Sequence, residues 1–200
     1  MSRVPTQCAA AFTLVEMLVV VAIISAVMVL AVPALNSTLN SANLTTAAQL
    51  VSDQFLLARQ EAVARNREVV VRFYRLPTAT ATEWRGVQVL RIEQTPTGLR
   101  TVPLSRLTVF PTGVIVSPSA ALSPLLSADA DNSGSDSLSA YGDVAYGGIS
   151  YRPNGFVGGG VSSSNNFLTL QNANASGTPP PNYATIQINP VTGKPSSFRP

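Results

Sequence analysis

The hydrophobic pattern changes twice along the first half of the chain. No charged residue occurs from Met17 to Ser52, and the run from Met17 to Leu35 is almost wholly apolar. The nineteen residues of this run would span roughly 28 Å as a helix, which is close to the hydrocarbon thickness of a bilayer. The run therefore predicts a membrane-spanning helix.

Beyond Pro33 the apolar positions recur three or four residues apart, which is the period of an amphipathic helix. These positions are Leu44, Ala48, Val51, Phe55, Ala58 and Ala62. We expect this helix to continue the membrane helix to about Asn66, as one rod of roughly 80 Å with a bend at Pro33. Its C-terminal half should pack on its own sheet. The N-terminal half has nothing of its own to pack on, so it needs lipid or other helices.

After Arg67 the pattern alternates, as expected for strands. Residues 68–75 and 84–93 predict two strands that pair, with Val87, Val89 and Leu90 turned inward. Shorter candidates follow, separated by clusters of Gly, Pro, Asn and Ser. They are residues 108–110, 114–116, 148–151, 166–170 and 184–188. The fold class predicted is α+β, in which a long N-terminal helix packs on a small antiparallel sheet that forms the head.

The amino-acid composition limits the kinds of functional site that the chain can form. Two hundred residues suffice for one folded head plus extra segments. The charged fraction is 12%, against roughly a quarter in a soluble domain. The net charge of +3 is too small to indicate nucleic acid by field strength. The absence of histidine excludes histidine-based triads and histidine metal sites. The single cysteine, Cys8, lies ahead of the apolar run, in a stretch that we expect to be removed.

A short basic leader precedes the apolar run, and its only charged side chain is Arg3. By the positive-inside tendency this end stays in the cytoplasm, and the rest of the chain faces outward. An ordinary secretory signal peptide, cut near Ala34, is one explanation. Glu16 argues against it, because an unpaired carboxylate at the mouth of a membrane span costs on the order of 2 to 3 kcal/mol or more. Cleavage after Ala11 would create a cation to meet it, the new amino group of Phe12.

The string from Ala11 to Glu16, AFTLVE, resembles the prepilin processing site, usually written GFTLVE. The resemblance implies cleavage between Ala11 and Phe12, N-methylation of Phe12, and roles in filament assembly for Glu16 and for Pro33, which stands where pilins place a helix-kinking proline. The chain departs from the family at Ala11, where glycine is strongly preferred. This departure implies slower cleavage or a tolerant peptidase.

The head resembles a narrower group, the minor pseudopilin H and fimbrial T (GspH/FimT-like) branch of the type IV pilin-like proteins. The matching pieces are residues 57–73, Trp84 with Gly86, the YRPNG turn at 151–155 and IQINPVTGK at 186–194. The pieces VSDQ, VVVRFY and a terminal SFRP resemble the Verru_Chthon cassette protein D group.

The resemblance divides the chain into four parts. Residues 1–11 are a prepilin leader that is cleaved, residues 12–35 a transmembrane and assembly helix, residues 36–67 an amphipathic helix on the head, and residues 68–200 an antiparallel β head with flexible loops.

The function implied is that of a minor structural subunit of a type IV pilus or a type II secretion pseudopilus, anchored in the inner membrane with its head in the periplasm until it joins a filament. Its partners would be the prepilin peptidase and methyltransferase, other pilin or pseudopilin subunits, the inner-membrane assembly platform and the lipid bilayer. We expect no cofactor, no metal and no enzyme activity. The alternative is a membrane-anchored binding module for DNA or secreted cargo.

Three segments of the head invite other interpretations. The spacing of three acidic residues, Asp129, Asp131 and Asp136, resembles the start of a calcium loop. However, Ser133 and Ala140 occupy the fifth and twelfth positions of that loop, where ligands are required. A solvated loop is the simpler interpretation.

Glycines in residues 155–164 could bind phosphate only between a strand and a helix start, so this segment and residues 171–182 are predicted to be surface loops. Arginines could follow a nucleic-acid backbone, namely Arg59, Arg65, Arg67, Arg152 and Arg199, with Lys194. The simpler explanation of Arg65 and Arg67 is favourable charge at a helix C-terminus, where Glu61 can pair with Arg65.

Overall fold

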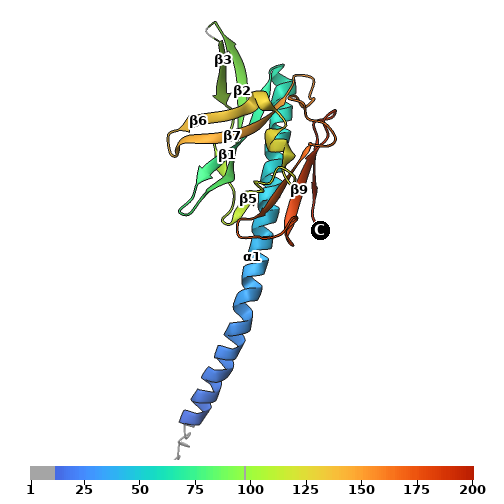
Figure 1. The fold of residues 1–200 in the computed structure, drawn as a ribbon. Coiled ribbons are helices and arrows are strands. Elements are labelled where there is room, and N and C mark those ends of the chain that lie inside the picture. The colour runs from blue at the N-terminus through green and yellow to red at the C-terminus, as the bar shows by residue number, and fades with distance from the viewer. Residues whose placement is uncertain (1–11, 97) are drawn as a thin grey trace, which may run out of the picture. The chain divides into compact units, whose positions relative to one another are not determined.

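The computed structural model describes residues 12–96 and 98–200, and for residues 30–36 it describes the backbone alone. The first element is one long helix, α1, from Leu14 to Arg65 (Figure 1). The chain divides into two compact units, residues 1–39 and residues 40–200. The second unit is the head, and it includes the C-terminal part of α1.

Helix α1 ends at a residue that favours the required backbone conformation. Asn66 has a φ of 51°, a left-handed value that asparagine tolerates better than most residues. The turn lets the amide of Arg67 donate to the carbonyl oxygen of Ala62 at 3.2 Å. The predicted end near Asn66 is therefore confirmed.

Ten strands and two short 3-10 helices follow α1. The first strands are β1 (Val69–Pro77), β2 (Thr82–Thr95), β3 (Gly98–Pro103), β4 (Thr108–Val109) and β5 (Val114–Val116). The 3-10 helices η1 (Pro124–Ser127) and η2 (Ala130–Asn132) come next. The remaining strands are β6 (Ser133–Leu138), β7 (Gly142–Tyr151), β8 (Phe167–Asn172), β9 (Tyr183–Ile188) and β10 (Pro195–Phe198).

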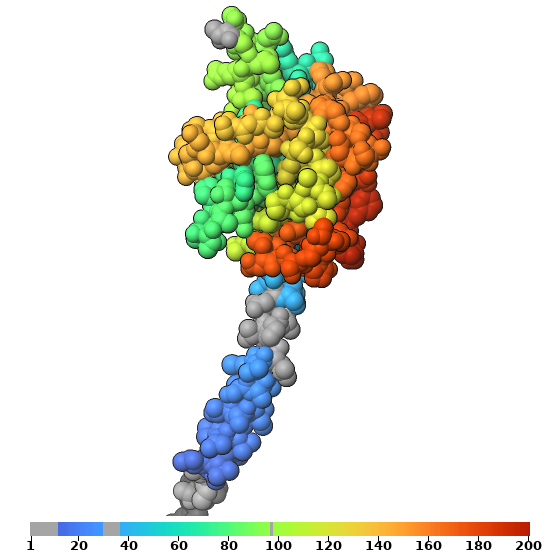
Figure 2. Space-filling view, in the orientation of Figure 1, coloured from blue at the N-terminus to red at the C-terminus, as the bar shows by residue number. Residues whose placement is uncertain are grey.

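The strands form two antiparallel sheets, where the sequence predicted one. The six-stranded sheet has the order β3-β2-β1-β7-β6, with β4 paired to β2, and the four-stranded sheet has the order β10-β9-β8-β5. The predicted pairing of the first two strands is confirmed, with Val71 opposite Val89. The C-terminal segments, orange to red in Figure 2, cover one side of the head. The α+β class is confirmed.

The core lies where α1 meets the two sheets. All six positions of the predicted apolar stripe are buried, and Phe55, Ala58 and Ala62 have no exposed surface. The ring of Phe55 lies 5.9 Å from that of Phe73 on β1 at an angle of 59°, a tilted pairing that adds about 0.5 to 1.5 kcal/mol beyond area burial. The small alanines let the helix approach the strands closely, so the stripe fixes which face of α1 the head covers.

The opposite face of the six-stranded sheet is also buried in part. Along β1, side chains alternate between the two faces, so Val71 and Phe73 join the main core while Tyr74 and Leu76 form a second apolar cluster with Val144 of β7. Leu90, predicted to turn inward with Val89, is buried at 3% exposure. It lies opposite Val70, on the face away from α1.

Candidate processing and assembly site

The predicted cleavage site lies at the start of the described chain. Ala11 falls outside the described residues, and Phe12 is the first residue within them. Phe12 precedes the helix and exposes 69% of its surface. The predicted scissile bond therefore lies just before α1 begins.

The first turn of α1 is stabilised by its own sequence. The hydroxyl oxygen of Thr13 accepts a hydrogen bond from the backbone N–H of Glu16 at 3.2 Å, which makes Thr13 the N-cap of the helix. Threonine followed by glutamate three residues later is the capping-box pattern. This local role of Thr13 was missed in the sequence analysis, although the spacing carries the signal.

Glu16 is the one charged residue in the N-terminal part of the helix. It lies in the first turn, where the partial positive charge of a helix N-terminus favours a carboxylate by about 0.3 to 1 kcal/mol. Among the described residues, the Glu16 carboxylate forms no ion pair and accepts no hydrogen bond. Within the chain as described, this charge is balanced only by the helix end.

Large apolar side chains are exposed all around the N-terminal part of α1. Leu18, Val19, Val20 and Val21 are four successive exposed residues, and successive residues of a helix point about 100° apart. The full set is exposed by 43% to 81%: Phe12, Leu14, Val15, Met17, Leu18, Val19, Val20, Val21, Ile23, Ile24, Val27, Met28 and Val29. A helix that is apolar on every side is suited to a lipid or protein interior.

Within the described residues, no helix meets the combined requirements of length and hydropathy for a membrane span.

Two polar or helix-breaking residues interrupt this apolar segment. The hydroxyl of Ser25 donates to the carbonyl oxygen of Val21 at 2.8 Å, so its hydrogen-bonding need is met inside the helix. The backbone is helical through Pro33. The side chain of Pro33 lies outside the described residues, so its predicted assembly role stays a prediction.

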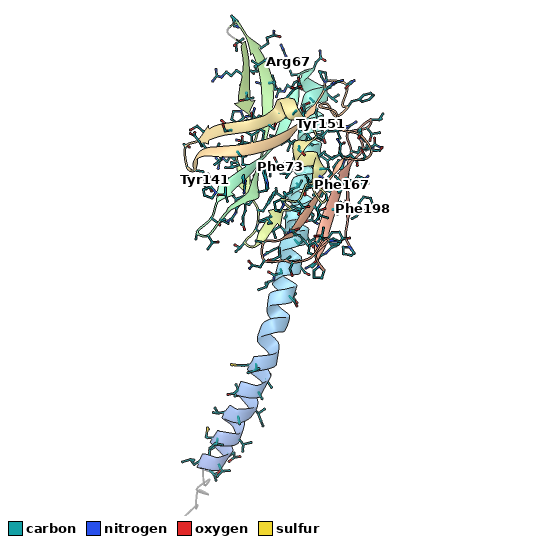
Figure 3. The ribbon with its side chains drawn as sticks, in the orientation of Figure 1. Arg67, Phe73, Tyr141, Tyr151, Phe167 and Phe198 are labelled. Carbon is teal, nitrogen blue, oxygen red and sulfur yellow. The ribbon has the colours of Figure 1, made fainter. Side chains whose placement is uncertain are left out.

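In the head, three segments singled out in the sequence meet around Arg59. The guanidinium Nε of Arg59 donates to the carbonyl oxygen of Thr192 at 2.7 Å. The hydroxyl of Tyr151, labelled in Figure 3 at the end of β7, donates to the carbonyl oxygen of Gly193 at 3.3 Å. Any Cβ at Gly193 would press against the carbonyl oxygen of Gly155. The YRPNG and NPVTGK turns are therefore closely packed on α1.

In the described structure, the acidic residues of this segment are not gathered as the ligands of a calcium loop would be. Asp129 is buried, and its Oδ2 accepts hydrogen bonds from the side chain of Asn132 at 2.8 Å and from the backbone and hydroxyl of Ser150 at 3.2 and 3.1 Å. Asp136 lies on β6 and faces Arg72 at 3.1 Å. In the described part of the chain, no three acidic, histidine or cysteine side chains are placed to bind a metal ion.

The ion pair of Arg72 and Asp136 anchors a polar cluster on the face of the sheet away from α1. The guanidinium of Arg72 lies 4.0 Å from the ring centre of Tyr146, at a distance typical of a cation–π contact. The hydroxyl of Tyr74 donates to Asp136 at 3.2 Å. Burial, followed by the nearby charge of Asp136, raises the pKa of Tyr74 to about 12. The segment predicted to be a solvated loop thus contains strand β6, held on the sheet by a partly buried charge pair.

Three of the five arginines considered for nucleic-acid binding make side-chain contacts within the chain. Arg59 binds Thr192, and Arg65 pairs with Glu61 at 3.3 Å, as the spacing predicted. The side chain of Arg199 donates to the side-chain oxygen of Asn182 at 3.0 Å. These contacts do not favour the nucleic-acid alternative.

The glycine-rich stretch 155–164 connects β7 to β8 and is not followed by a helix. It therefore lacks the strand-to-helix setting that phosphate binding needs.

Comparison with known proteins bears mainly on the N-terminus. Residues 7–32 match the family model described as the prokaryotic N-terminal methylation motif. No curated protein matches the chain. Among solved structures, a match is the minor pseudopilin EpsH from the Type 2 Secretion System of Vibrio cholerae, with a TM-score of 0.44 and 13% identity over 79% of this chain and 98% of that one.

The family match confirms the prediction of a prepilin-type N-terminal methylation motif. The narrower likeness to the Verru_Chthon cassette protein D group stays a prediction.

Proposed function

We propose that this chain is a minor structural subunit of a type IV pilus or a type II secretion pseudopilus. In this proposal a prepilin peptidase removes residues 1–11, the amine of Phe12 is methylated, and the subunit waits in the inner membrane with its head in the periplasm before it joins a filament. The observation that carries the proposal is the coincidence of the N-terminal methylation motif at residues 7–32 with a helix whose apolar side chains are exposed on every side.

The physical reason for an assembling subunit lies in this exposed apolar surface. Each Å² of apolar surface left in water costs about 25 cal/mol, so a segment of this kind is not stable as a free helix in solvent. The proposed membrane supplies the first apolar environment, because the run from Met17 to Leu35 is about as long as a bilayer is thick. A bundle of like helices supplies the second.

Glu16 supplies the proposed specificity of assembly. Its carboxylate forms no ion pair among the described residues, while the proposed cleavage creates an amine four residues earlier, at Phe12. We assign Glu16 to neutralise the Phe12 amine of an adjacent subunit in the filament core. Leaving either charge unpaired in such surroundings costs about 3 to 5 kcal/mol, so the pair would favour correct register over other arrangements.

Intact mass spectrometry of the protein extracted from its native membrane tests the proposal. The expected mass corresponds to residues 12–200 plus one methyl group. Full-length protein, or a chain that begins near residue 34, would contradict it, the latter being the result expected for a secretory signal peptide. The same sample from cells that lack the prepilin peptidase is the control, and it should retain all two hundred residues.

The proposed role is structural and does not involve catalysis. The second candidate, a membrane-anchored module that binds DNA, is not favoured because its principal helix arginines are occupied by Thr192 and Glu61.

A further inference from the structure

A groove lies on the face of the six-stranded sheet away from α1, between the β2–β3 hairpin and the loops around η2. Its main cavity has a volume of about 400 Å³ and is lined in part by Ile92, Leu99, Asp129, Asp131 and Arg152. A second depression of about 270 Å³ shares Ile92 and Leu99 and continues to Pro153. The hairpin that forms one wall is visible in Figure 1 at the end of the head, labelled β2 and β3.

A buried carboxylate lies at the bottom of the groove. Asp129 is only 1% exposed, and all three hydrogen bonds that it accepts from the described residues go to Oδ2. Its second oxygen, Oδ1, accepts none from them. No lysine or arginine of the described chain forms an ion pair with Asp129. Oδ1 has no partner among the described residues but is not fully enclosed, and Asp129 lines the cavity, so Oδ1 is suited to accept a donor from outside the chain.

The backbone at Gly159 leaves space for the carboxyl group of Asp129. Gly159 has a φ of 71°, in the left-handed region that disfavours side chains. A Cβ at Gly159 would collide with the carboxyl group of Asp129. The glycine therefore keeps Asp129 in place beside the cavity.

The opposite wall of the groove is apolar and exposed. Leu99 on edge strand β3 exposes 75% of its surface, the largest fraction among the large apolar side chains of the described head. Ile92 on β2 is half-buried beside it. A leucine this exposed next to a cavity marks a surface that gains free energy when a partner covers it.

We infer that this groove binds an extended segment of a partner protein that carries a lysine or arginine next to an apolar side chain. The cation would donate to Oδ1 of Asp129, with Asp131 and Glu68 adding negative charge at the rim, and the apolar side chain would cover Leu99 and Ile92. The three carboxylates that line the cavity outnumber its one arginine, Arg152, which gives the charge complementarity. This site is formed by residues of the head, and the inference does not depend on the proposed function.

Binding of two matched peptides to the full-length protein in detergent micelles tests the inference. One peptide is Ac-Gly-Leu-Lys-Leu-Gly-NH2, and the other has norleucine in place of lysine. Methyl NMR of the leucines reports occupancy at Leu99. The lysine peptide should bind about tenfold more tightly, the ratio expected when a charge-assisted hydrogen bond contributes the difference.

Variants identify the contact. Asp129→Asn should make the two peptides bind equally while the norleucine peptide keeps its wild-type affinity, whereas a collapse of the site would weaken both peptides. Leu99→Ser, at an exposed position that does not test folding, should weaken both peptides by the same factor. Equal binding of the two peptides by the wild-type protein, or undiminished binding by Leu99→Ser, would overturn the inference. So would a calcium-induced shift at this site that blocks the lysine peptide, since it would identify a cation site instead.

Discussion

The guanidinium of Arg59 on α1 donates its Nε hydrogen bond to the carbonyl oxygen of Thr192 at 2.7 Å, across 133 positions of the chain. The contact joins the helix to the turn that precedes β10. The neighbouring bond from the Tyr151 hydroxyl to Gly193 holds the same turn from the side of β7. A single turn thus connects the helix with both sheets.

Replacement of Arg59 should destabilise the head. Arg59→Ala removes a hydrogen bond from a charged donor, so we expect it to lower the free energy of unfolding by about 1.5 to 3 kcal/mol. Arg65→Ala is the matched control on the same helix, because the Arg65 side chain is 61% exposed and such surface pairs contribute about 0 to 1 kcal/mol. Thermal unfolding of the detergent-solubilised protein measures both. Equal, small losses would show that the contact is not important for stability.

The contact at Arg59 illustrates what could be predicted from the sequence and what could not. The stripe from Leu44 to Ala62 was predictable because burial on one side of a helix leaves a period of three to four residues. The same periodicity assigns no partner to Arg59, which lies beside the stripe. Its acceptor is a backbone carbonyl in a distant turn, and no side-chain pattern encodes a carbonyl.

Separate variants should distinguish the two roles of Glu16 and Thr13. Glu16→Gln keeps the shape of the side chain but removes its charge, so we expect complete processing and at least a tenfold loss of assembled filament, because each contact would leave an amine unpaired at a cost of about 3 to 5 kcal/mol. Thr13→Ala loses the N-cap bond at a cost of about 1 kcal/mol but keeps the charge. Its assembly should stay close to that of the wild type. The measurement is the amount of subunit in sheared filaments relative to the membrane fraction.

Two results would contradict this assignment. Normal assembly of Glu16→Gln would show that the charge is not needed. An equal loss in Thr13→Ala would show that the helix start, and not charge neutralisation, limits assembly.

The residue before the predicted scissile bond should control the rate of processing. Ala11→Gly restores the residue that prepilin sites prefer, so we expect faster conversion of the full-length chain to the form that begins at Phe12. Pulse-chase labelling followed by mass analysis gives the two rates. Arg3→Gln is a control that alters the leader without changing the site. An unchanged rate in Ala11→Gly would indicate a peptidase adapted to alanine.

Alkaline pH should destabilise the head through Tyr74. Its pKa is raised from 10.0 to about 12 by burial and by Asp136, so the folded state retains the phenolic proton after the unfolded state has lost it. Stability contributed by the protonated hydroxyl is therefore complete below about pH 10 and falls as pH rises towards 12. Burial also raises the pKa of Tyr151, so this residue contributes to the loss of stability at alkaline pH in the same way.

The midpoint of thermal unfolding, measured at intervals between pH 9 and pH 12, checks the contribution of Tyr74. Tyr74→Phe should reduce the fall of the unfolding midpoint with rising pH, and the remaining fall should be the part due to Tyr151. The variant should also lose about 1 kcal/mol at neutral pH through its missing hydrogen bonds. A decline that runs parallel to that of the wild type would show that other groups cause it.

The strands that the sequence did not predict have a common physical cause. β6 reads SGSDSL, with no apolar alternation, because one of its edges is free and it is held by pairing with β7 and by the ion pair of Asp136 with Arg72. β3 and β10 are also edge strands with short or exposed sequences. By contrast, β5 is also an edge strand but all three of its residues are buried, and the predicted positions of β5 and of the inner strand β9 agree closely with the structure. Alternation of apolar and polar residues indicates that one face of a strand is buried, and an edge strand can form without such a pattern.

The hydrogen bond from Ser25 to the carbonyl of Val21 has a consequence for the life cycle proposed for the subunit. Because the one hydroxyl between Met17 and Val29 is already satisfied, this stretch can exchange one set of apolar neighbours for another without breaking a side-chain hydrogen bond. The subunit in the filament and the subunit in the membrane would then differ mainly in the packing of this stretch and in whether the charge of Glu16 is paired. Such a small difference would allow the same subunit to be recovered and used again.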